Sequence, residues 1–366
     1  MSHSKTTWNT YLERELPIIT ALLAPYGITL ATDQPHTKGE RFLMRALTTT
    51  SGQKLILLGA QTSTGKKVVI KATNDLAGIQ ELTHEQNCRT LLHKMNFSHD
   101  TFHAPSEILF LQKQGYTIFV TEFIDQSSSF LERPVEEQFT FALKALKAQE
   151  RTRATTAAHI AQIRSTFGSR NSDEYLRMFE AFLITCKNKR AESATITLLE
   201  KSFEKLSAAK ERIEQYSDFL THTDFVPHNF RISGETLYLL DFSSLRFGNK
   251  HEGWARFLNF MTLYNPALEE LLISYVDQNR SLEERESLQL MRLFRLGEII
   301  AYYTNTLERS EDNLLRLNEA RIHFWSTVLK AELSNTRVGR DAVELYKAER
   351  DRLRSEDEKV RQIGLH

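Results

Sequence analysis

The sequence of 366 residues has few of the features that mark several common classes of protein. It contains only two cysteines, Cys88 and Cys186, which excludes a disulfide framework and a cysteine-rich metal site and is typical of a reducing compartment. It has no excess charge, because 47 lysines and arginines balance 47 aspartates and glutamates. The basic surplus expected of a nucleic-acid-binding protein is therefore missing.

Long apolar runs are missing as well. The longest, such as residues 55–58, are far shorter than the roughly 20 residues that cross a bilayer. Residues 1–8 lack the basic stretch followed by an apolar segment that marks a secretory signal. We therefore expect a cytoplasmic protein with neither a membrane nor a nucleic acid as partner. Only 14 glycines and 7 prolines are present, which favours more helix than average.

Hydrophobic periodicity divides the chain into a β-rich first part and a helical second part. Residues 7–24 have helical spacing, which Pro17 is expected to kink or divide. Short apolar and β-branched runs predict antiparallel strands over 41–47, 54–58, 67–72, 108–111 and 116–124, with a helix over 78–95 between the third and fourth. Helical spacing then follows over 134–150, 155–167, 173–188, 194–219 and from 254 onward, interrupted by a hairpin over 230–242.

These segments predict an α+β architecture of two lobes. The small antiparallel β lobe covers residues 1–125, the larger helical lobe covers 126–335, and a charged helical tail covers 336–366. A thin apolar stripe follows this tail, formed by Val338, Ala342, Leu345 and Leu353. Such a helix is either a solvated surface element or the contact between two copies of the chain in a homodimer.

Two motifs that could bind phosphate or metal are weak. Residues 60–67 nearly copy a phosphate-binding loop, but Lys67 stands where a serine or threonine is needed and the residues after it are strand-like. We interpret this segment as a hairpin tip. His99 and His103 have helical spacing without an evident third ligand, so no metal site is expected there.

The strongest signal lies at 222–242. It reads His222-Thr-Asp224-Phe-Val-Pro-His-Asn229, followed by Leu-Leu-Asp241-Phe. An aspartate on such a loop can accept or orient the proton of an attacking hydroxyl. An asparagine five residues later and a second aspartate across a hairpin can converge on Mg²⁺, which neutralises nucleotide phosphates.

This segment resembles the H-G-D-x-H-x-x-N…D-F signature of aminoglycoside phosphotransferases, choline kinases and related small-molecule kinases, which have a protein-kinase-like two-lobe fold. The resemblance is specific only around 222–242 and 67–72, and it departs from the signature at Thr223, Val226 and His228. It implies a divergent kinase that uses Mg²⁺ and ATP or GTP to phosphorylate a hydroxyl of a small molecule. Asp224 would be catalytic, His222 would brace the loop, and the magnesium ligands would be Asn229 and Asp241.

The same resemblance assigns residues upstream. Lys71 would hold the α- and β-phosphates with Glu85 as its partner, or Glu81 as the second choice. The backbones of Glu122 and Ile124 would meet the adenine edge. The glycine-rich lid is reduced to Thr48–Gly52, which contains one glycine; Ser243 replaces a glycine after Asp241-Phe242, and Arg256 stands near the place of a further structural aspartate.

The residues leave three points open. A pseudokinase that binds a nucleotide or a partner as a scaffold is the second hypothesis, and a protein Ser/Thr kinase is a weaker third because no A-P-E-like segment follows Asp241. A cationic acceptor, such as an aminosugar or choline, could be received by acidic residues of the helical lobe, although such residues are more often solvated. The candidates are Glu252, Glu269, Glu270 and Glu298.

Overall fold

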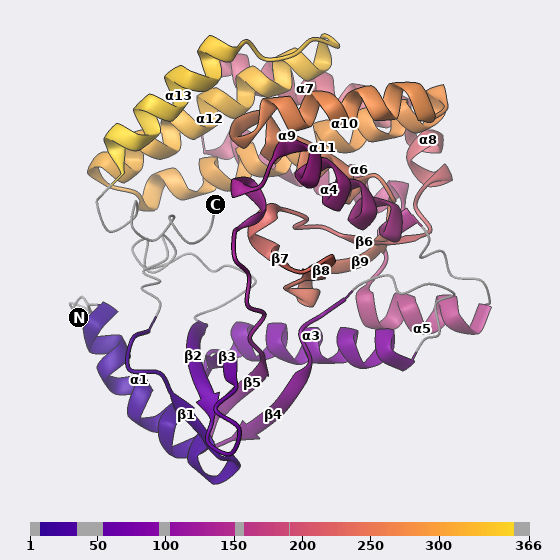
Figure 1. Cartoon of the computed structure of the whole chain (residues 1–366). Helices are drawn as coiled ribbons and strands as arrows, with labels where there is room; N and C mark the ends of the chain where they lie inside the picture. Colours follow the sequence, from indigo (N-terminus) through magenta and orange to yellow (C-terminus); the bar gives the residue numbers. More distant parts are fainter. Residues whose placement is uncertain (1–7, 35–53, 95–102, 151–156, 190, 355–366) are drawn as a thin grey trace.

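The first lobe is built on a five-stranded antiparallel sheet (Figure 1). The computed structural model describes residues 8–34, 54–94, 103–150, 157–189 and 191–354. The strands follow the order β1–β2–β3–β5–β4, and they are β1 (Ile28–Leu30), β2 (Leu55–Gln61), β3 (Lys67–Thr73), β4 (Glu107–Lys113) and β5 (Tyr116–Glu122). Four of the predicted strands are confirmed, while the strand expected over 41–47 and the lid at Thr48–Gly52 lie outside the described residues. The turn between β2 and β3 confirms the hairpin tip at 60–67.

One face of this sheet packs on helix α1 (Trp8–Leu23). Side chains alternate along β2, so Leu55 and Leu57 are buried with Ile19 of α1 while Ile56 points to the other face. Helix α1 continues through Pro17, so of the two expectations the division of this helix is wrong and the kink stays a prediction. Because Pro17 is exposed, the carbonyl that loses its helical hydrogen bond can be solvated by water.

Helix α3 (Leu76–Lys94) lies across the opposite face of the sheet (Figure 1). It begins where Asp75 Oδ2 accepts hydrogen bonds from the backbone amides of Ala77 and Gly78, at 3.1 and 3.2 Å. A side chain at Gly78 would place its Cβ 2.5 Å from Thr73 Oγ1, so glycine allows the helix to approach β3 closely. The buried face of α3 therefore includes Glu85, which lies against the sheet.

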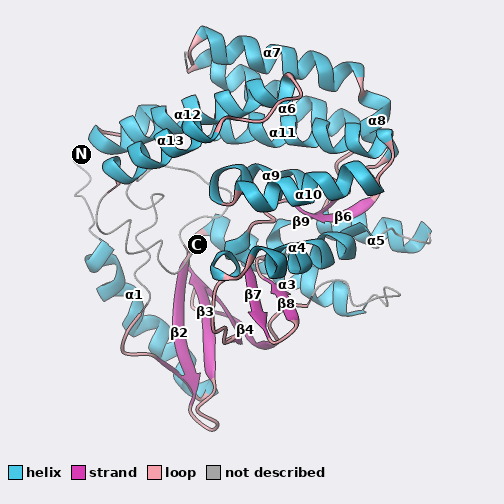
Figure 2. Cartoon of the chain, turned by 45° about the horizontal axis from the view of Figure 1, so that its top comes forward, coloured by secondary structure: helices cyan, strands magenta, loops and turns pink. Residues whose placement is uncertain are grey.

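The second lobe is mostly helical, as Figure 2 shows. Its core surrounds α11, which packs on α6, α9 and α12 and buries Leu290, Met291, Leu293 and Phe294 completely. The helices are α4 (Val135–Glu150), α5 (Ala157–Phe167), α6 (Ser172–Asn188), α7 (Ser193–Ala208), α8 (Lys210–Gln215), α9 (Glu252–Tyr264), α10 (Pro266–Asn279), α11 (Leu282–Thr306), α12 (Asp312–Leu333) and α13 (Arg340–Leu353). None of the described helices combines the length and the apolar character that a bilayer span requires.

Short strands and single turns of 3-10 helix carry the segment predicted to be catalytic. Strand β6 (Phe219–His222) pairs with β9 (Leu245–Gly248), and between them the hairpin of β7 (Phe230–Ser233) and β8 (Thr236–Leu239) confirms the predicted one. The turns are η3 (Pro227–Asn229) and η4 (Phe242–Ser244); elsewhere lie η1 (Ala24–Tyr26), η2 (Phe130–Glu132) and η5 (Leu307–Arg309). Strands β1, β6 and β9 were missed because three or four residues are too few to show alternation and, unlike β7 and β8, no tight turn joins them to the strand with which they pair.

The tail helix α13 folds back on α12 of the same chain. Tyr346 stacks on Phe324, with ring centroids 4.3 Å apart, and Val343 and Leu353 are buried beside it. Leu345, which belonged to the expected apolar stripe, is instead 74% exposed. The apolar face of α13 is thus occupied within the chain, and the homodimer expected through this helix gains no support.

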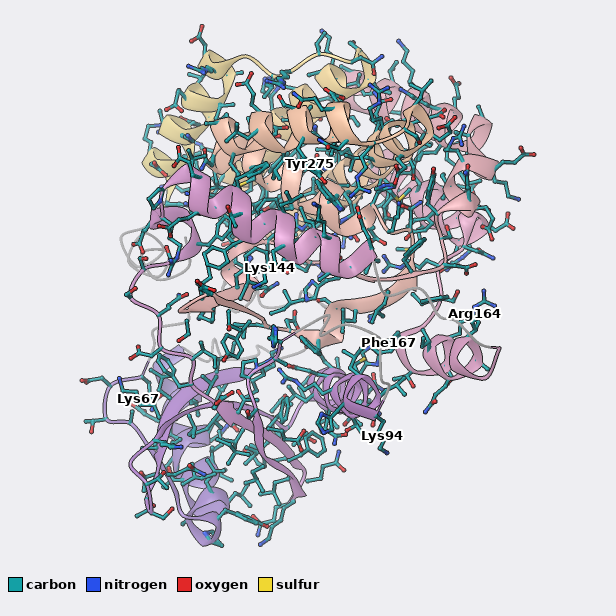
Figure 3. The ribbon with its side chains drawn as sticks, turned by 45° about the vertical axis from the view of Figure 1, so that its right-hand side comes forward. Lys67, Lys94, Lys144, Arg164, Phe167 and Tyr275 are labelled. Atoms are coloured by element: carbon teal, nitrogen blue, oxygen red, sulfur yellow. The ribbon has the colours of Figure 1, made fainter. Side chains whose placement is uncertain are left out.

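Helix α5 joins the two lobes on one side of the molecule. Figure 3 shows Arg164 and Phe167 of α5 beside the end of α3 at Lys94. Phe167 is almost completely buried, and Gly168 and Arg170 form backbone hydrogen bonds with Phe247 of β9. Through this helix, α3 of the first lobe contacts the strand that follows Asp241.

A buried glutamine anchors the strand that leads to the catalytic loop. Gln149 of α4 is fully buried, and its Oε1 accepts hydrogen bonds from Thr221 Oγ1 at 3.2 Å and from the His222 amide at 3.1 Å. A Cβ at Gly253 would lie 2.5 Å from the same oxygen, so glycine lets α9 pack against this contact. The position of β6 therefore depends on a side chain from a distant helix.

Replacement of Gln149 by leucine should destabilise the protein, because it leaves the His222 amide and the Thr221 hydroxyl buried without this acceptor. We expect the free energy of unfolding, measured by urea denaturation, to fall by about 1–3 kcal/mol. The matched control is Gln278→Leu at an exposed position of α10, which should change stability by less than about 0.5 kcal/mol. A Gln149→Leu protein as stable as the wild type would contradict this role.

Candidate active site

Two loops that carry the predicted aspartates are held together by hydrogen bonds. His222 Nε2 donates to the carbonyl oxygens of Leu240 and Asp241, both at 3.0 Å. The amide and the hydroxyl of Thr223 both donate to the carbonyl of Ser244, each at 2.9 Å. Burial lowers the pKa of His222, so its imidazole is neutral and the Nε2 proton is committed to these carbonyls.

Asp224 lies between an arginine and an asparagine. Its Oδ1 accepts from Arg256 Nε at 3.1 Å and Nη2 at 2.9 Å. Asn229 Nδ2 donates to the Asp224 carbonyl at 2.8 Å and to Oδ2 at 3.1 Å. Burial alone would raise the pKa of Asp224, but Arg256 holds it well below its ordinary value, so the group is a carboxylate.

Asp241 has a left-handed backbone conformation, with φ 58° and ψ 61°, which a non-glycine residue seldom adopts outside constrained sites. Ser243 Oγ donates to its Oδ1 at 2.5 Å, and Ser244 Oγ donates to Oδ2 at 3.1 Å. Burial would raise the pKa of Asp241, but Lys71 and then Lys54 lower it below its ordinary value. The serine that replaces the expected glycine therefore has a definite contact.

Lys71 and Glu85 form the ion pair expected from the sequence. Lys71 Nζ lies 2.7 Å from Glu85 Oε2 and 2.9 Å from Oε1, and Arg89 Nη2 lies 3.1 Å from the same carboxylate. The side chain of Glu85 is fully buried. Glu81, the second choice, pairs instead with Lys54 at 2.5 Å.

The face of the sheet around Lys71 carries an apolar surface, formed by Ile56, Leu58 and Val69, which we call the shelf. Ile56 lies opposite Lys71 in the β2–β3 register, and Leu58 lies opposite Val69. Ile56 is 40% exposed, although it lies near the start of a strand between two buried leucines. An exposed apolar side chain beside a lysine is suited to a flat, partly apolar ligand that also carries negative charge.

The residues expected to meet the adenine edge lie at the end of β5. The Glu122 amide already donates to the Ser106 carbonyl at 3.0 Å, so only the Glu122 carbonyl could meet a base. The Glu122 side chain accepts from the amide and hydroxyl of Ser106, at 2.7 and 2.9 Å. Ile124 follows two residues later and is buried. Contact of either backbone with a base stays a prediction.

The chemistry of Asn229 and Asp241 suits magnesium. The amide nitrogen of Asn229 is used by Asp224, which leaves its oxygen as the free ligand atom, and Asp241 supplies a carboxylate. No group of three or more histidine, cysteine, aspartate or glutamate side chains suited to a metal occurs among the described residues. That is compatible with Mg²⁺, which proteins usually hold through one or two carboxylates, together with substrate phosphates and water.

The glutamates proposed to receive a cationic acceptor all have arginine partners. Glu252 is fully buried and accepts from Arg170 at 2.7 Å and from Arg295 at 3.2 Å. The other pairs are Glu269 with Arg292, Glu270 with Arg337 and Glu298 with Arg295. The sequence could not show these partners because they come from other helices, and the structure gives no support to a cation receptor built from these residues.

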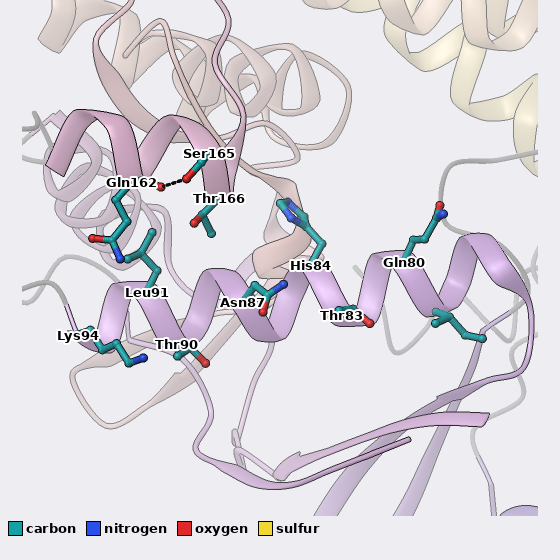
Figure 4. Close-up of a pocket in the computed structure, with 11 residues that line it drawn as sticks. Gln80, Thr83, His84, Asn87, Thr90, Leu91, Lys94, Gln162, Ser165 and Thr166 are labelled. Atoms are coloured by element: carbon teal, nitrogen blue, oxygen red, sulfur yellow. Dashed lines mark hydrogen bonds between the residues drawn. The ribbon is translucent and has the colours of Figure 1, made fainter. Parts of the chain in front are cut away.

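A separate hollow of about 540 Å³ lies between α3 and α5 (Figure 4). Its walls carry amide and hydroxyl side chains, and His84 at its edge accepts a hydrogen bond from Arg246 Nη1 at 2.9 Å. None of the predicted site residues lines it. The hollow is therefore distinct from the surroundings of Asp224 and Asp241.

Sequence reasoning missed several residues that shape the site. Arg256 was noted only as a departure from a family pattern, and neither Lys54 nor Ser244 had any signal in the sequence. The hydrogen bond from Thr223 to the loop after Asp241 was also unforeseen. Arg256, Lys54 and Thr223 act through partners distant in sequence, which local patterns do not contain, whereas Ser244 acts on Asp241 only because of the turn between them.

The fold is that of small-molecule phosphotransferases of known structure. Aminoglycoside phosphotransferase APH(4)-Ia matches with a TM-score of 0.61 at 11% identity, over 87% of this chain and 98% of that one. Amicoumacin kinase hAmiN, in complex with AMP-PNP, Ca²⁺ and Ami, matches with a TM-score of 0.57 at 11% identity, over 93% of this chain and 100% of that one. Spectinomycin phosphotransferase APH(9)-Ia, in complex with ADP and spectinomycin, matches with a TM-score of 0.52 at 18% identity, over 91% of this chain and 98% of that one.

No protein-family model matches the chain, and no curated protein sequence does. At 11–18% identity the likeness to solved structures establishes the fold alone. The two-lobe, protein-kinase-like α+β fold expected from the sequence is thereby confirmed.

The pairing around Glu85 predicts unequal effects of two substitutions. Glu85→Gln removes the charge shared by Lys71 and Arg89, so we expect a loss of about 3–5 kcal/mol in the free energy of unfolding. Lys71→Met should cost less, because Glu85 keeps Arg89. Urea denaturation of both variants measures this order, and equal losses or a larger one for Lys71→Met would contradict it.

The ion pair of Lys71 and Glu85 also makes the stability of the protein depend on pH. Lys71 and Arg89 hold the pKa of Glu85 below its ordinary value, although burial would raise it. A carboxyl whose pKa is lower in the folded state stabilises the protein above its unfolded pKa of about 4.3 and loses this effect as the pH falls further. The stability gap between wild type and Glu85→Gln should therefore narrow below that pH.

Proposed function

We propose that this protein is a kinase that binds a magnesium nucleotide, ATP or GTP, and transfers its γ-phosphate to a hydroxyl of a small molecule. The observation that supports the proposal is that Asn229 hydrogen-bonds Asp224, that His222 ties their loop to the backbone of Asp241, and that Lys71 lowers the pKa of Asp241. That these residues occur in a fold found in phosphotransferases supports it further.

The nucleotide side of the proposed site uses residues of both lobes. Lys71, held by Glu85, would bind phosphate oxygens, and the base would lie on the shelf that contains Ile56, with the Glu122 carbonyl and the Ile124 backbone at its edge. Asn229 and Asp241 would hold magnesium, which neutralises charge on the phosphates when bound. Because phosphoryl transfer depends mainly on positioning and charge neutralisation, fixed side chains suffice for this part of catalysis.

The acceptor side would be served by Asp224. Arg256 keeps its carboxylate ionised, so it can accept a hydrogen bond from the acceptor hydroxyl and direct that oxygen toward the phosphate. A carboxylate with a lowered pKa is a weak base, which suits a loose transition state in which the proton leaves late. His222 acts as a positioning residue, because its hydrogen bonds hold the loop of Asp224 against Asp241.

The acceptor belongs to the broad class of small hydroxyl compounds, such as an aminoglycoside, choline or a sugar. Structures of similar fold contain hygromycin B with ADP and spectinomycin with ADP. The arginine partners of Glu252 and Glu269 make a strongly cationic acceptor less favoured than the sequence suggested. The described structure also keeps the segment after Asp241 short, because β9 follows η4 directly, which disfavours a protein substrate loop.

Thermal denaturation with nucleotides tests the binding half of the proposal. Magnesium with ATP or GTP at 1 mM should raise the Tm of the wild type; at 100 times Kd the stabilisation is about 2.7 kcal/mol. Asp241→Asn should remove most of this shift, because the metal ligand is lost. Asp277→Asn, an exposed aspartate of α10, is the matched control and should keep the full shift. No shift in the wild type with either nucleotide would refute a kinase.

A pseudokinase scaffold is the second candidate function. It is favoured by one observation, that Asp224 is engaged by Arg256 and Asp241 by two serine hydroxyls. A scaffold would bind nucleotide without hydrolysing it. Slow nucleotide hydrolysis that Asp224→Asn reduces at least about 100-fold would exclude the scaffold, because a catalytic carboxylate contributes effects of that size.

The contact of Arg256 predicts the pH dependence of this hydrolysis. In the wild type, Arg256 keeps the pKa of Asp224 below its ordinary value. Asp224 should therefore stay ionised between pH 8 and about pH 5, and its protonation should not reduce kcat in this range. In Arg256→Met the opposing effect of burial remains, so the acid limb of kcat should move to higher pH. An unchanged pH–rate profile in the variant would contradict control of Asp224 by Arg256.

A further inference from the structure

Lys54 is a second lysine beside Asp241 that the fold comparison does not assign. It directly precedes β2, two residues before Ile56, which lies opposite Lys71 in the β2–β3 register. Side chains two residues apart on a strand share a face, and so do the two members of an antiparallel pair. Lys54 and Lys71 therefore project from the same face of the sheet, toward α3.

Helix α3 supplies a matching glutamate to each lysine. Glu81 and Glu85 are four residues apart, so they lie one helical turn from each other on the same side of the helix. Lys54 Nζ is 2.5 Å from Glu81 Oε1, as Lys71 Nζ is 2.7 Å from Glu85 Oε2. The first lobe thus presents two parallel lysine–glutamate pairs instead of one.

Both pairs face Asp241. The pKa of Asp241 is lowered by Lys71 and by Lys54, and the pKa of Lys54 is raised by Glu81 and Asp241 despite burial, so Lys54 remains an ammonium. Ser243 Oγ, which donates to Asp241 Oδ1, lies 3.5 Å from Glu81 Oε1. Both lysines therefore lie close enough to act on the carboxylate proposed to hold magnesium, and Ser243 connects the Lys54–Glu81 pair to it.

The Lys54–Glu81 pair is incompletely satisfied as a structural salt bridge. Within the described part of the chain, Glu81 Oε2 is buried without a hydrogen-bond partner. Among the described residues, Lys54 donates a hydrogen bond only to Glu81, so two of its three ammonium protons remain available. The Lys54 side chain keeps 15% of its surface exposed, so an incoming anion can reach it. A phosphate oxygen can take the free ammonium protons of Lys54, whereas Glu81 Oε2 is itself an acceptor and would not be satisfied by an anion.

We propose that Lys54 is a second phosphate-binding lysine, which contacts the terminal phosphates of the nucleotide together with Lys71, and that Glu81 is its positioning residue. This inference rests on the proposed function, because it names a further contact in the same nucleotide site. A phosphate oxygen would take the free ammonium protons while Glu81 keeps the lysine in place. Lys54 would therefore let the protein distinguish nucleotides that carry terminal phosphates from nucleotides that lack them.

Equilibrium binding of magnesium–ATP, ADP and AMP to the full chain tests this. Lys54→Met should weaken ATP and ADP about 10- to 100-fold, the size of a charge-assisted hydrogen bond of about 1.5–3 kcal/mol, and should change AMP less than about twofold. Lys54→Arg should restore part of the loss. Lys66→Met, at the exposed β2–β3 turn, is the matched control and should bind all three nucleotides as the wild type does.

A second measurement needs no variant and so does not depend on how Lys54→Met folds. Lysine acetylation of the wild type, read by mass spectrometry, should slow severalfold at Lys54 when magnesium–ATP is present and stay unchanged at Lys66. Adenosine should give no protection at Lys54.

The outcomes separate the two proposals. If the wild type binds no nucleotide, the kinase proposal fails and the role of Lys54 falls with it. If the wild type binds ATP but Lys54→Met binds it equally well, or if ATP does not protect Lys54 from acetylation, only the role of Lys54 is overturned. A lower Tm without nucleotide, at unchanged affinity, would make the pair a purely structural salt bridge.

Discussion

The structure of the site depends on the hydrogen bonds that join the loop of Asp224 to the loop of Asp241. His222 and Thr223 donate from one loop to the carbonyls of Leu240, Asp241 and Ser244 on the other. The strands β6 and β9 extend the same contact by pairing. Because these are mostly backbone acceptors, the spacing between the two aspartates is set by main-chain geometry, and side chains around it can vary without moving it.

Charge is distributed around this pair so that each carboxylate has cations from another element. Asp224 takes Arg256 from α9, Asp241 has Lys71 and Lys54 from the sheet, and Glu85 of α3 takes Lys71 with Arg89. Buried ion pairs of this kind add little net stability, because desolvation opposes attraction, but removal of one partner is costly. The arrangement is therefore better understood as positioning than as a source of stability.

The departures from the kinase-like signature are compensated locally. Thr223, in the place of a glycine, gains two hydrogen bonds to Ser244, and Ser243, in the place of another, caps Asp241. The Thr223 substitution ties the two loops together, whereas Ser243 acts within the loop of Asp241. The hydroxyls of Ser243 and Ser244 lie on the Asp241 carboxylate, where the proposed magnesium would lie, so metal binding would rearrange these contacts.

The sequence by itself determined the two-lobe layout, the strand with Lys71, the helix with Glu85 and the hairpin between Asn229 and Asp241. These follow from local periodicity and from residue spacing, which survive even when identity to proteins of similar fold is 11%. Tertiary structure alone decided that Arg256 would neutralise Asp224, that Gln149 would anchor β6, and that Glu81 would pair with Lys54. It also decided that α13 would pack on α12 through Tyr346, with Leu353 of the expected stripe buried and Leu345 exposed. In each case the partner lies far away in sequence, and only the folded chain brings the two groups within hydrogen-bonding or packing distance.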